Sequence, residues 1–520
     1  MRSIKTVAAV AVGLTAAVLT FGPSGAIAAQ PEPRGADTLV RTDIGALRGA
    51  SDGSVRSWLG VPYAAPPEGE LRWESPQPAA AWKGVREATD FGNACAQAET
   101  NMPAVPSTDE DCLYLNVYAP DQARGDLPVM VWFHGGGNAY GAGEQYDPSM
   151  LVRDGRTVVV TINYRQGLFA NMAHPALDDD GTISGNYGLE DQQAALRWVR
   201  DNAGAFGGAE DNVTIFGESG GGYDVCAHLT SPTSEDLFDK AIVQSAPCTT
   251  DWAPTRAAAQ ARDIAFADEV CPTDADVEAC LRDLTPEALN AAAVGLYEVQ
   301  PVIGGPVMQV PTADAILAGD VADVPVLIGI NRDEEQLMTA GIEVLSGHVM
   351  TAEEYYPALV EQFGAQAEAI AAEYPLSDYE NPAKALAAVQ TDAHWAEPLA
   401  TTVEALAEQV PTYAYEMSVS GTPYFPWVDR PSWELDAFHM VDVAFLFDTT
   451  IFEDRAAEVE PLSDLMVDSW STFARTGDPD GRGCWHEARR DLVRQLTPEG
   501  ARTVDFAAEH RVGFWRGLSA

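Results

Sequence analysis

Five short runs of β-branched and aromatic residues recur along the chain, and polar or glycine-rich segments separate them. The runs predict β-strands over residues 129–133, 157–163, 213–216, 241–244 and 324–330. Each run is apolar nearly throughout instead of alternating with polar residues, which is typical of strands that are covered on both faces. The patterning therefore predicts a parallel sheet at the centre of the protein.

Helical patterns lie between and after these runs. Apolar residues three or four positions apart predict a helix over residues 188–206 that packs on the sheet. Residues 351–409 are rich in Ala, Glu and Leu and predict a helical insertion, which a last strand at 412–417 and a closing helix at 465–473 follow. This order of elements predicts an α/β fold, with a mostly parallel central sheet flanked by helices and a late helical insertion.

The first 28 residues differ from the rest of the chain. Arg2 and Lys5 precede an apolar stretch over residues 7–21, and Ala26-Ile27-Ala28 follows it, which together predict a secretory signal peptide over residues 1–28. A membrane anchor is the alternative, but the apolar stretch ends short of the roughly 20 residues that a span requires. We expect a secreted, extracellular protein with no membrane anchor. Its mature part, residues 29–520, has no internal repeat or low-complexity linker and is predicted to form one domain.

Charge narrows the set of partners. The chain carries a formal net charge of −47 at pH 7, and a field of that sign disfavours nucleic acid and anionic membranes as partners. We interpret the acidity as favouring solubility in the surrounding medium, in preference to binding of a cationic substrate.

Export places the seven cysteines in an oxidising environment, and their odd number leaves at least one unpaired. Two pairs that are close in sequence and flanked by polar residues predict loops closed by disulfides: Cys95 with Cys112, and Cys271 with Cys280. Cys226 and Cys248 lie in apolar surroundings and are interpreted as small buried side chains.

A candidate nucleophile follows the strand predicted at residues 213–216. The sequence Gly217-Glu218-Ser219-Gly220-Gly221 matches G-x-S-x-G, in which a sharp strand-to-helix turn holds a serine exposed above the sheet. A purely structural glycine turn is the alternative. The strand before the motif and the small residues after it favour a nucleophile at Ser219.

A second glycine-rich turn, His134-Gly135-Gly136-Gly137, follows the strand predicted at 129–133. Bare backbone amides at such a turn can donate to the negative oxygen that develops in acyl transfer. We expect an oxyanion hole formed by the amides of Gly136 and Gly137, with Gly220 as a third donor. A flexible glycine loop is the alternative.

The chain has eight histidines that could serve as the general base. His439 follows the last predicted strand, which fits the order serine, acid, histidine of this arrangement. From position alone a buried structural histidine remains an equal alternative. His134 belongs to the glycine turn, His228 is expected to be buried, and the rest lack a telling context: His174, His348, His394, His486 and His510.

The acid is expected between the serine and the histidine, just after a strand. Residues 326–330 supply that strand, and Asp333, Glu334 and Glu335 follow it. A solvated acidic helix start is the alternative, and spacing does not choose among the three carboxylates.

Two long segments resemble the type-B carboxylesterase family, which includes the cholinesterases and related lipases. They are residues 110–120, Glu-Asp-Cys-Leu-Tyr-Leu-Asn-Val-Tyr-Ala-Pro, and residues 206–221, which contain the Ser219 turn. Shorter family-like segments, such as 59–67 and 473–479, extend the resemblance over about residues 41–515. The resemblance implies an α/β-hydrolase fold and a bacterial secreted carboxylesterase.

The resemblance also implies roles for individual residues. The family's acid is the glutamate of a D-E-G tripeptide, which corresponds to Glu334, and its base corresponds to His439. The same two disulfide loops, closed by Cys95 with Cys112 and by Cys271 with Cys280, are implied. The sequence departs from the family at Gly220, where alanine is usual, and at Glu335 and Ala246, where glycine is usual. None of these departures removes a catalytic group.

The expected function is hydrolysis of carboxylic esters of small molecules through an acyl-enzyme on Ser219. No cofactor and no metal are expected, because the sequence has no P-loop, no H-E-x-x-H and no paired C-x-x-C. The alternative is an inactive, cholinesterase-like binding or adhesion protein, although such relatives usually lack the serine that this chain keeps.

In the cholinesterase branch a tryptophan in the first disulfide loop binds the choline cation. The loop from Cys95 to Cys112 has no aromatic residue, which predicts a preference for neutral esters with short or medium acyl groups.

Overall fold

A computed structural model describes residues 38–98, 105–123, 125–178, 183–272, 276–293, 299–481, 483–488 and 492–519. The expected signal peptide, residues 1–28, lies outside the described residues. No helix among the described residues is long and apolar enough to span a membrane.

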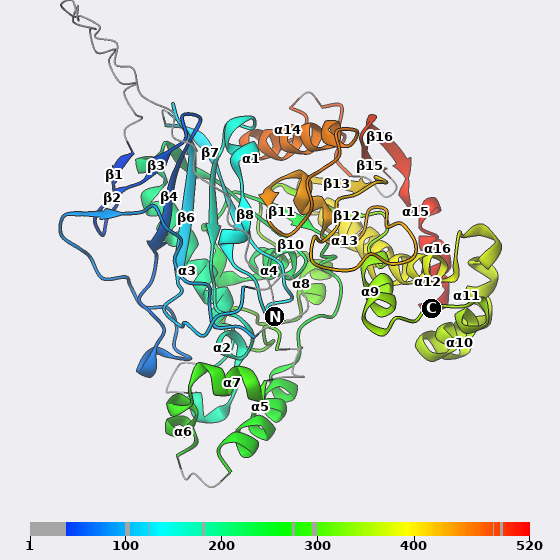
Figure 1. Ribbon diagram of the computed structural model, residues 1–520, viewed down its shortest axis with the longest axis horizontal. Coiled ribbons are helices and arrows are strands. Elements are labelled where there is room, and N and C mark those ends of the chain that lie inside the picture. The colour runs from blue at the N-terminus through cyan, green and yellow to red at the C-terminus, as the bar shows by residue number, and fades with distance from the viewer. Residues whose placement is uncertain are drawn as a thin grey trace, which may run out of the picture. The chain divides into compact units, whose positions relative to one another are not determined.

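The core of the fold is an eleven-stranded sheet (Figure 1). From one edge to the other its strands are β16 (Gly500–Asp505), β15 (Leu492–Thr497), β13 (Thr412–Met417), β12 (Val326–Asn331), β11 (Lys240–Gln244), β10 (Gly208–Glu218), β7 (Leu127–Phe133), β9 (Val158–Ile162), β6 (Tyr114–Pro120), β4 (Val55–Pro62) and β3 (Ala50–Ser51). The strands from β15 to β9 run parallel, and the pairs at both edges are antiparallel. The predicted parallel sheet is therefore confirmed, and all five predicted inner strands are present.

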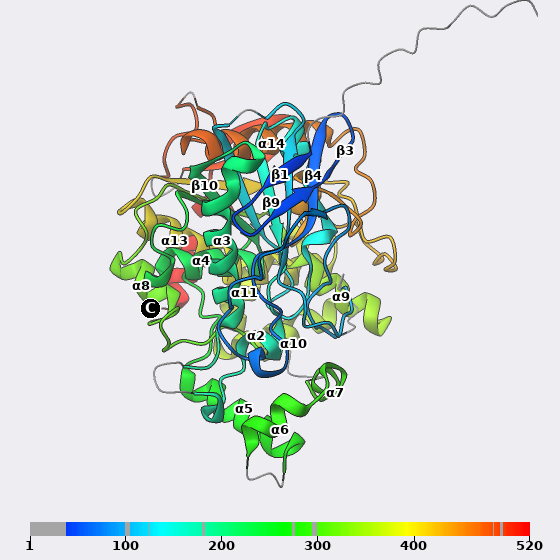
Figure 2. The same ribbon diagram turned by 90° about the vertical axis from the view of Figure 1, so that its left-hand side faces the viewer.

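Alternate residues of the inner strands enter two separate hydrophobic cores, which explains why the runs are apolar throughout. On β7, Val131 packs in one core with α3 (Tyr187–Phe206) and α4 (Gly220–Thr230). Its neighbour Trp132 packs in the other core with α14 (Glu460–Thr476). Helices therefore cover both faces of the sheet (Figures 1 and 2).

The predicted helical insertion is present between β12 and β13. Helix α9 (Gln336–Ser346) precedes it, and the helices of the insertion are α10 (Ala352–Phe363), α11 (Ala367–Glu373), α12 (Pro382–Thr391) and α13 (Glu397–Ala407). A π-helical turn, η7 (Asp392–Ala396), joins α12 to α13. The closing helix is also present, as the longer α14.

The prediction that residues 412–417 form the last strand is wrong. The hairpin of β15 and β16 follows and extends the sheet beyond β13. The sequence of this hairpin is mostly polar, and its only buried residues are Val493, Gln495, Leu496 and Val504. It therefore contains no continuous apolar run from which its strands could have been predicted. Another group of helices, α5 (Arg256–Val270), α6 (Val277–Asp283) and α7 (Pro286–Ala292), lies between β11 and β12 in the chain and at the bottom of Figure 1.

Candidate active site

Ser219 occupies the sharp turn between β10 and α4. Its φ of 54° and ψ of −122° are unusual for a residue with a side chain. A Cβ atom at Gly221 would lie 2.0 Å from the carbonyl oxygen of Phe133, and one at Gly217 would lie 2.5 Å from the backbone of Gly221. Glycine is therefore required on both sides of Ser219 so that the turn can pack against β7.

His439 connects Ser219 to Glu334. Its Nε2 lies 2.9 Å from Ser219 Oγ, and its Nδ1 lies 2.7 Å from Glu334 Oε2. The backbone amide of His439 also donates to the carbonyl oxygen of Glu334 at 3.1 Å. The fold thus brings together, in hydrogen-bonding order, three side chains that are more than 100 positions apart in the sequence.

Of the three adjacent carboxylates after β12, Glu334 is the one that reaches the imidazole. Its other oxygen, Oε1, accepts hydrogen bonds from the amide of Asn331 at 2.8 Å and from Ser245 Oγ at 2.6 Å. Glu335 instead accepts a hydrogen bond from Trp395 Nε1 at 2.8 Å. Burial, followed by the charge of Asp436, raises the pKa of Asp333 to about 7.

The imidazole lies among acidic groups. Burial lowers the pKa of His439, but Glu218 and Glu334 outweigh burial and raise it to about 9. Oε1 of Glu218 lies 3.4 Å from His439 Nε2, and burial holds the pKa of Glu218 well above its usual range. Burial also raises the pKa of Asp442 to about 6.

The predicted oxyanion loop lies against the Ser219 turn. Gly136 and Gly137 have φ values of +113° and +58°, and a Cβ at Gly220 would lie 2.8 Å from the nitrogen of Gly137. The amides of Gly136, Gly137 and Gly220 have no hydrogen-bond acceptor within the described part of the chain. Three unengaged donors therefore lie on two segments that meet next to Ser219.

A buried polar network, which the sequence reasoning missed, supports this loop. Asn138 Nδ2 donates to Asp224 Oδ1 at 3.1 Å, and Gln192 Nε2 donates to the other oxygen of Asp224 at 2.6 Å. Gln300 Nε2 donates to the carbonyl oxygen of Gly137 at 3.0 Å. The one available signal in the sequence was a carboxylate, Asp224, in an otherwise apolar helix after the serine.

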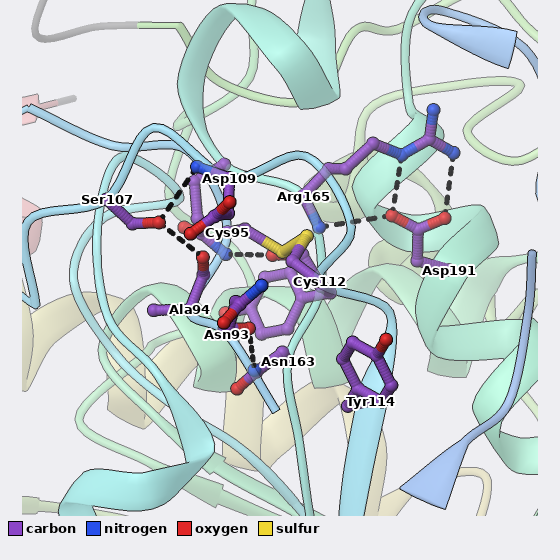
Figure 3. Close-up of a disulfide and its surroundings, with 12 residues drawn as sticks. Asn93, Ala94, Cys95, Ser107, Asp109, Cys112, Tyr114, Asn163, Arg165 and Asp191 are labelled. Atoms are coloured by element: carbon purple, nitrogen blue, oxygen red, sulfur yellow. Dashed lines mark hydrogen bonds and ion pairs between the residues drawn. A yellow bond between two sulfur atoms is a disulfide. The ribbon is translucent and has the colours of Figure 1, made fainter. Parts of the chain in front are cut away.

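Three disulfides are present among the described residues: Cys95 with Cys112, Cys226 with Cys248, and Cys271 with Cys280. Figure 3 shows the first, beside which Ser107 Oγ donates to the carbonyl oxygen of Ala94 at 2.7 Å. Cys226 and Cys248 are buried, as expected, and they form a disulfide with each other that the sequence did not predict. Their bond ties α4 to the segment after β11, and an apolar environment fits a buried disulfide as well as a buried thiol. Cys484 is free and exposed.

The remaining histidines have other surroundings. Burial lowers the pKa of His134 to about 4 and that of His228 to about 3. His510, which had no telling context in the sequence, is buried between Asp392 and Glu416. No cluster of three or more His, Cys, Asp or Glu side chains in the described ranges could hold a metal ion.

Known proteins share the sequence and the fold. A family model described as Carboxylesterase family matches residues 36–515. Para-nitrobenzyl esterase of Bacillus subtilis is 33% identical over 483 residues, covering 88% of this chain and 94% of that protein. Carboxylesterase 1C of Rattus norvegicus is 32% identical over 511 residues, covering 90% and 89%. A solved structure of PNB esterase, 31% identical, matches with a TM-score of 0.76 and covers 92% of this chain and 99% of that one.

Proposed function

The chain belongs to the carboxylesterase family and is therefore an ester hydrolase, and we propose that it works through Ser219 as nucleophile, His439 as general base and Glu334 as orienting acid. The observation that carries this proposal is the unbroken series of hydrogen bonds from Ser219 Oγ through the imidazole to Glu334. A binding protein without activity has no need of such a series.

The first half of the reaction forms an acyl-enzyme. Ser219 Oγ attacks the ester carbonyl carbon while His439 Nε2 takes the hydroxyl proton. The carbonyl oxygen, which becomes negatively charged, accepts hydrogen bonds from the amides of Gly136, Gly137 and Gly220. Glu334 stabilises the imidazolium. The tetrahedral intermediate then collapses, and His439 returns its proton to the departing alcohol.

The second half releases the acid. His439 takes a proton from water, the resulting hydroxide attacks the acyl carbon, and the same amides stabilise the second tetrahedral intermediate. Collapse breaks the bond to Ser219 Oγ, which recovers its proton from His439. The chemistry needs only groups that the chain itself supplies.

We also propose that residues 1–28 are a secretory signal and that residues 29–520 form a single catalytic domain. Three disulfides support an extracellular location, since such bonds persist in oxidising compartments. Amino-terminal sequencing of protein from the culture medium tests this, with a mature chain that begins near residue 29 as the expected result.

For the substrate we propose neutral esters with short or medium acyl groups. The name of the relative para-nitrobenzyl esterase supports an ester of an uncharged alcohol. The test is turnover of a series of aryl esters that differ in acyl length, with Ser219→Ala as the blank. Turnover that is highest for short and medium acyl groups supports the proposed substrate, and turnover that disappears with Ser219→Ala in a folded protein supports Ser219 as the nucleophile. Full turnover by that variant would show that a residue other than Ser219 is the nucleophile.

A further inference from the structure

An indole ring packs against the imidazole of His439 in a tilted arrangement. The ring centroids of Trp395 and His439 are 4.8 Å apart, and their planes are inclined by 44°. The two hydrogen bonds hold Nδ1 and Nε2 but restrain rotation of the ring about the line through these two atoms only weakly. Packing by Trp395 restrains that tilt.

Trp395 is itself held by Glu335. The indole Nε1 donates to Glu335 Oε1 at 2.8 Å, and the amide of Glu335 donates to Thr391 Oγ1 at 3.1 Å. One residue thus ties the start of α9, next to Glu334, to the helical insertion at two points. Glu335 is also a position at which this sequence departs from the family pattern.

The π-helical turn explains how the indole reaches the imidazole. In η7 the amide of Glu397 donates to the carbonyl oxygen of Asp392, five residues earlier. A π-turn contains one residue more than an α-turn, so side chains that would share a face are directed apart. Asp392 Oδ1 lies 2.5 Å from His510 Nδ1, whereas the ring of Trp395 contacts His439.

We propose that Glu335 and Trp395 form a positioning pair for the general base, an inference that rests on the proposed role of His439. Glu335 fixes the indole, and the indole keeps Nε2 directed at the reacting oxygen after the bond to Ser219 Oγ breaks. The ring also stabilises the imidazolium that forms during acylation through a cation–π interaction. The pair acts on chemistry and leaves ester binding unchanged.

The test is a double-mutant cycle with Trp395→Phe, which removes the indole donor, and Glu335→Ala, which removes its acceptor. Each change should lower kcat by up to about tenfold, the scale of one lost hydrogen bond, with KM nearly unchanged. The double variant should be no slower than the slower single variant, because both changes break the same link. Glu335→Gln keeps an acceptor and should retain most of the turnover.

A matched control exists near α9. Trp433 Nε1 donates to Glu343 Oε2 at 3.0 Å, an equivalent pair whose indole has no ring contact with His439. Trp433→Phe and Glu343→Ala should leave kcat within about twofold of the parent, because they change no contact of the base. This control separates positioning from general loss of helix packing.

Three results would overturn the inference: unchanged kcat in both Trp395→Phe and Glu335→Ala, additive losses in the double variant, or a rise in KM alone. A rise in KM alone would make Trp395 a wall of the substrate pocket. Ser219→Ala, assayed in parallel, separates this failure from failure of the proposed mechanism. Loss of turnover in Ser219→Ala with normal turnover in the pair variants refutes only the positioning role, and thermal midpoints identify any variant that is unfolded.

Discussion

Oε1 of Glu218 lies 3.4 Å from Nε2 of His439, the same ring atom that faces Ser219. Burial lowers the pKa of His439, but the charges of Glu218 and Glu334 and the hydrogen bond to Glu334 outweigh burial and raise it to about 9. The base works only when it is neutral, so kcat/KM should increase with pH through that pKa. The rise should lie well above the usual histidine value of about 6.5.

Glu218→Gln tests this relationship directly. Removing the negative charge removes a cause of the raised pKa, so the acid limb of kcat/KM should move to lower pH. The measurement is kcat/KM for a neutral ester between about pH 5 and 10, a range chosen to span the usual and the raised values. An acid limb that stays in place, or moves to higher pH, would contradict the electrostatic role of Glu218.

The identity of the acid can be tested among three neighbours. Glu334→Gln should leave a folded enzyme with strongly reduced turnover, because the amide no longer holds the imidazole in its working orientation. Asp333→Asn and Glu335→Gln should be far milder, since neither carboxylate contacts the imidazole. Ser219→Ala and His439→Ala should abolish turnover. If Asp333→Asn matched Glu334→Gln at an unchanged thermal midpoint, the assignment of the acid would be wrong.

The limit of prediction from sequence is visible at these carboxylates. Asp333, Glu334 and Glu335 follow the strand at adjacent positions, so spacing did not distinguish them, and the resemblance to a family selected Glu334. The physical cause of the choice is tertiary, because Ser245, which donates to Glu334 Oε1, is 89 positions away in the chain. Spacing along one segment does not contain that contact.

The strands of the sheet also differ in how well the sequence predicts them. Inner strands such as β7 and β12 are predictable because burial on both faces imposes a continuous apolar run. The edge hairpin β15–β16 is exposed on part of its surface and carries no such run. The π-turn that contains Trp395 was not predicted either, since its sequence is compatible with an ordinary helix. Local patterns therefore predict the sheet and the sharp turn at Ser219, while contacts between distant segments determine the rest.

The oxyanion loop offers two glycines that should respond differently to substitution. A Cβ at Gly136 would lie 2.0 Å from the carbonyl oxygen of Tyr140, whereas one at Gly137 meets nothing within 4 Å. Gly136→Val should therefore displace the amide donors and reduce kcat by about 10² or more. Gly137→Ala keeps its amide in place, although its φ of +58° strains the new side chain, and should lose much less. Near-normal turnover of Gly136→Val would show that this loop does not form the oxyanion hole.

His510 should make stability depend on pH. Burial opposes its charge, but Asp392 and Glu416 outweigh burial and raise its pKa to about 10. Between the unfolded value of about 6.5 and the folded value, the folded state holds a proton that the unfolded state has lost. The stabilisation from His510 is thus complete below about pH 6.5 and is lost as pH rises toward 10.

His510→Gln removes this titrating group. The free energy of unfolding of the parent, measured with denaturant at several pH values, should fall toward pH 10 more steeply than that of the variant. Parallel curves for the two proteins would show that His510 does not bind its proton more tightly in the folded state.

Finally, a choline leaving group should give no advantage. The segment between Cys95 and Cys112 has no aromatic residue that could seat a quaternary ammonium group. The acidic residues of this segment do not replace an aromatic residue as a cation site. Glu110 is already paired with Arg72, whose Nε lies 2.7 Å from Glu110 Oε1. Asp111 accepts a hydrogen bond from the hydroxyl of Tyr114 at 2.8 Å. Asp109 is exposed, and salt screens an exposed charge. We expect kcat/KM for butyrylcholine to be no higher than for a neutral butyrate ester of similar leaving-group reactivity. A clear preference for the choline ester would require a cation site elsewhere in the pocket.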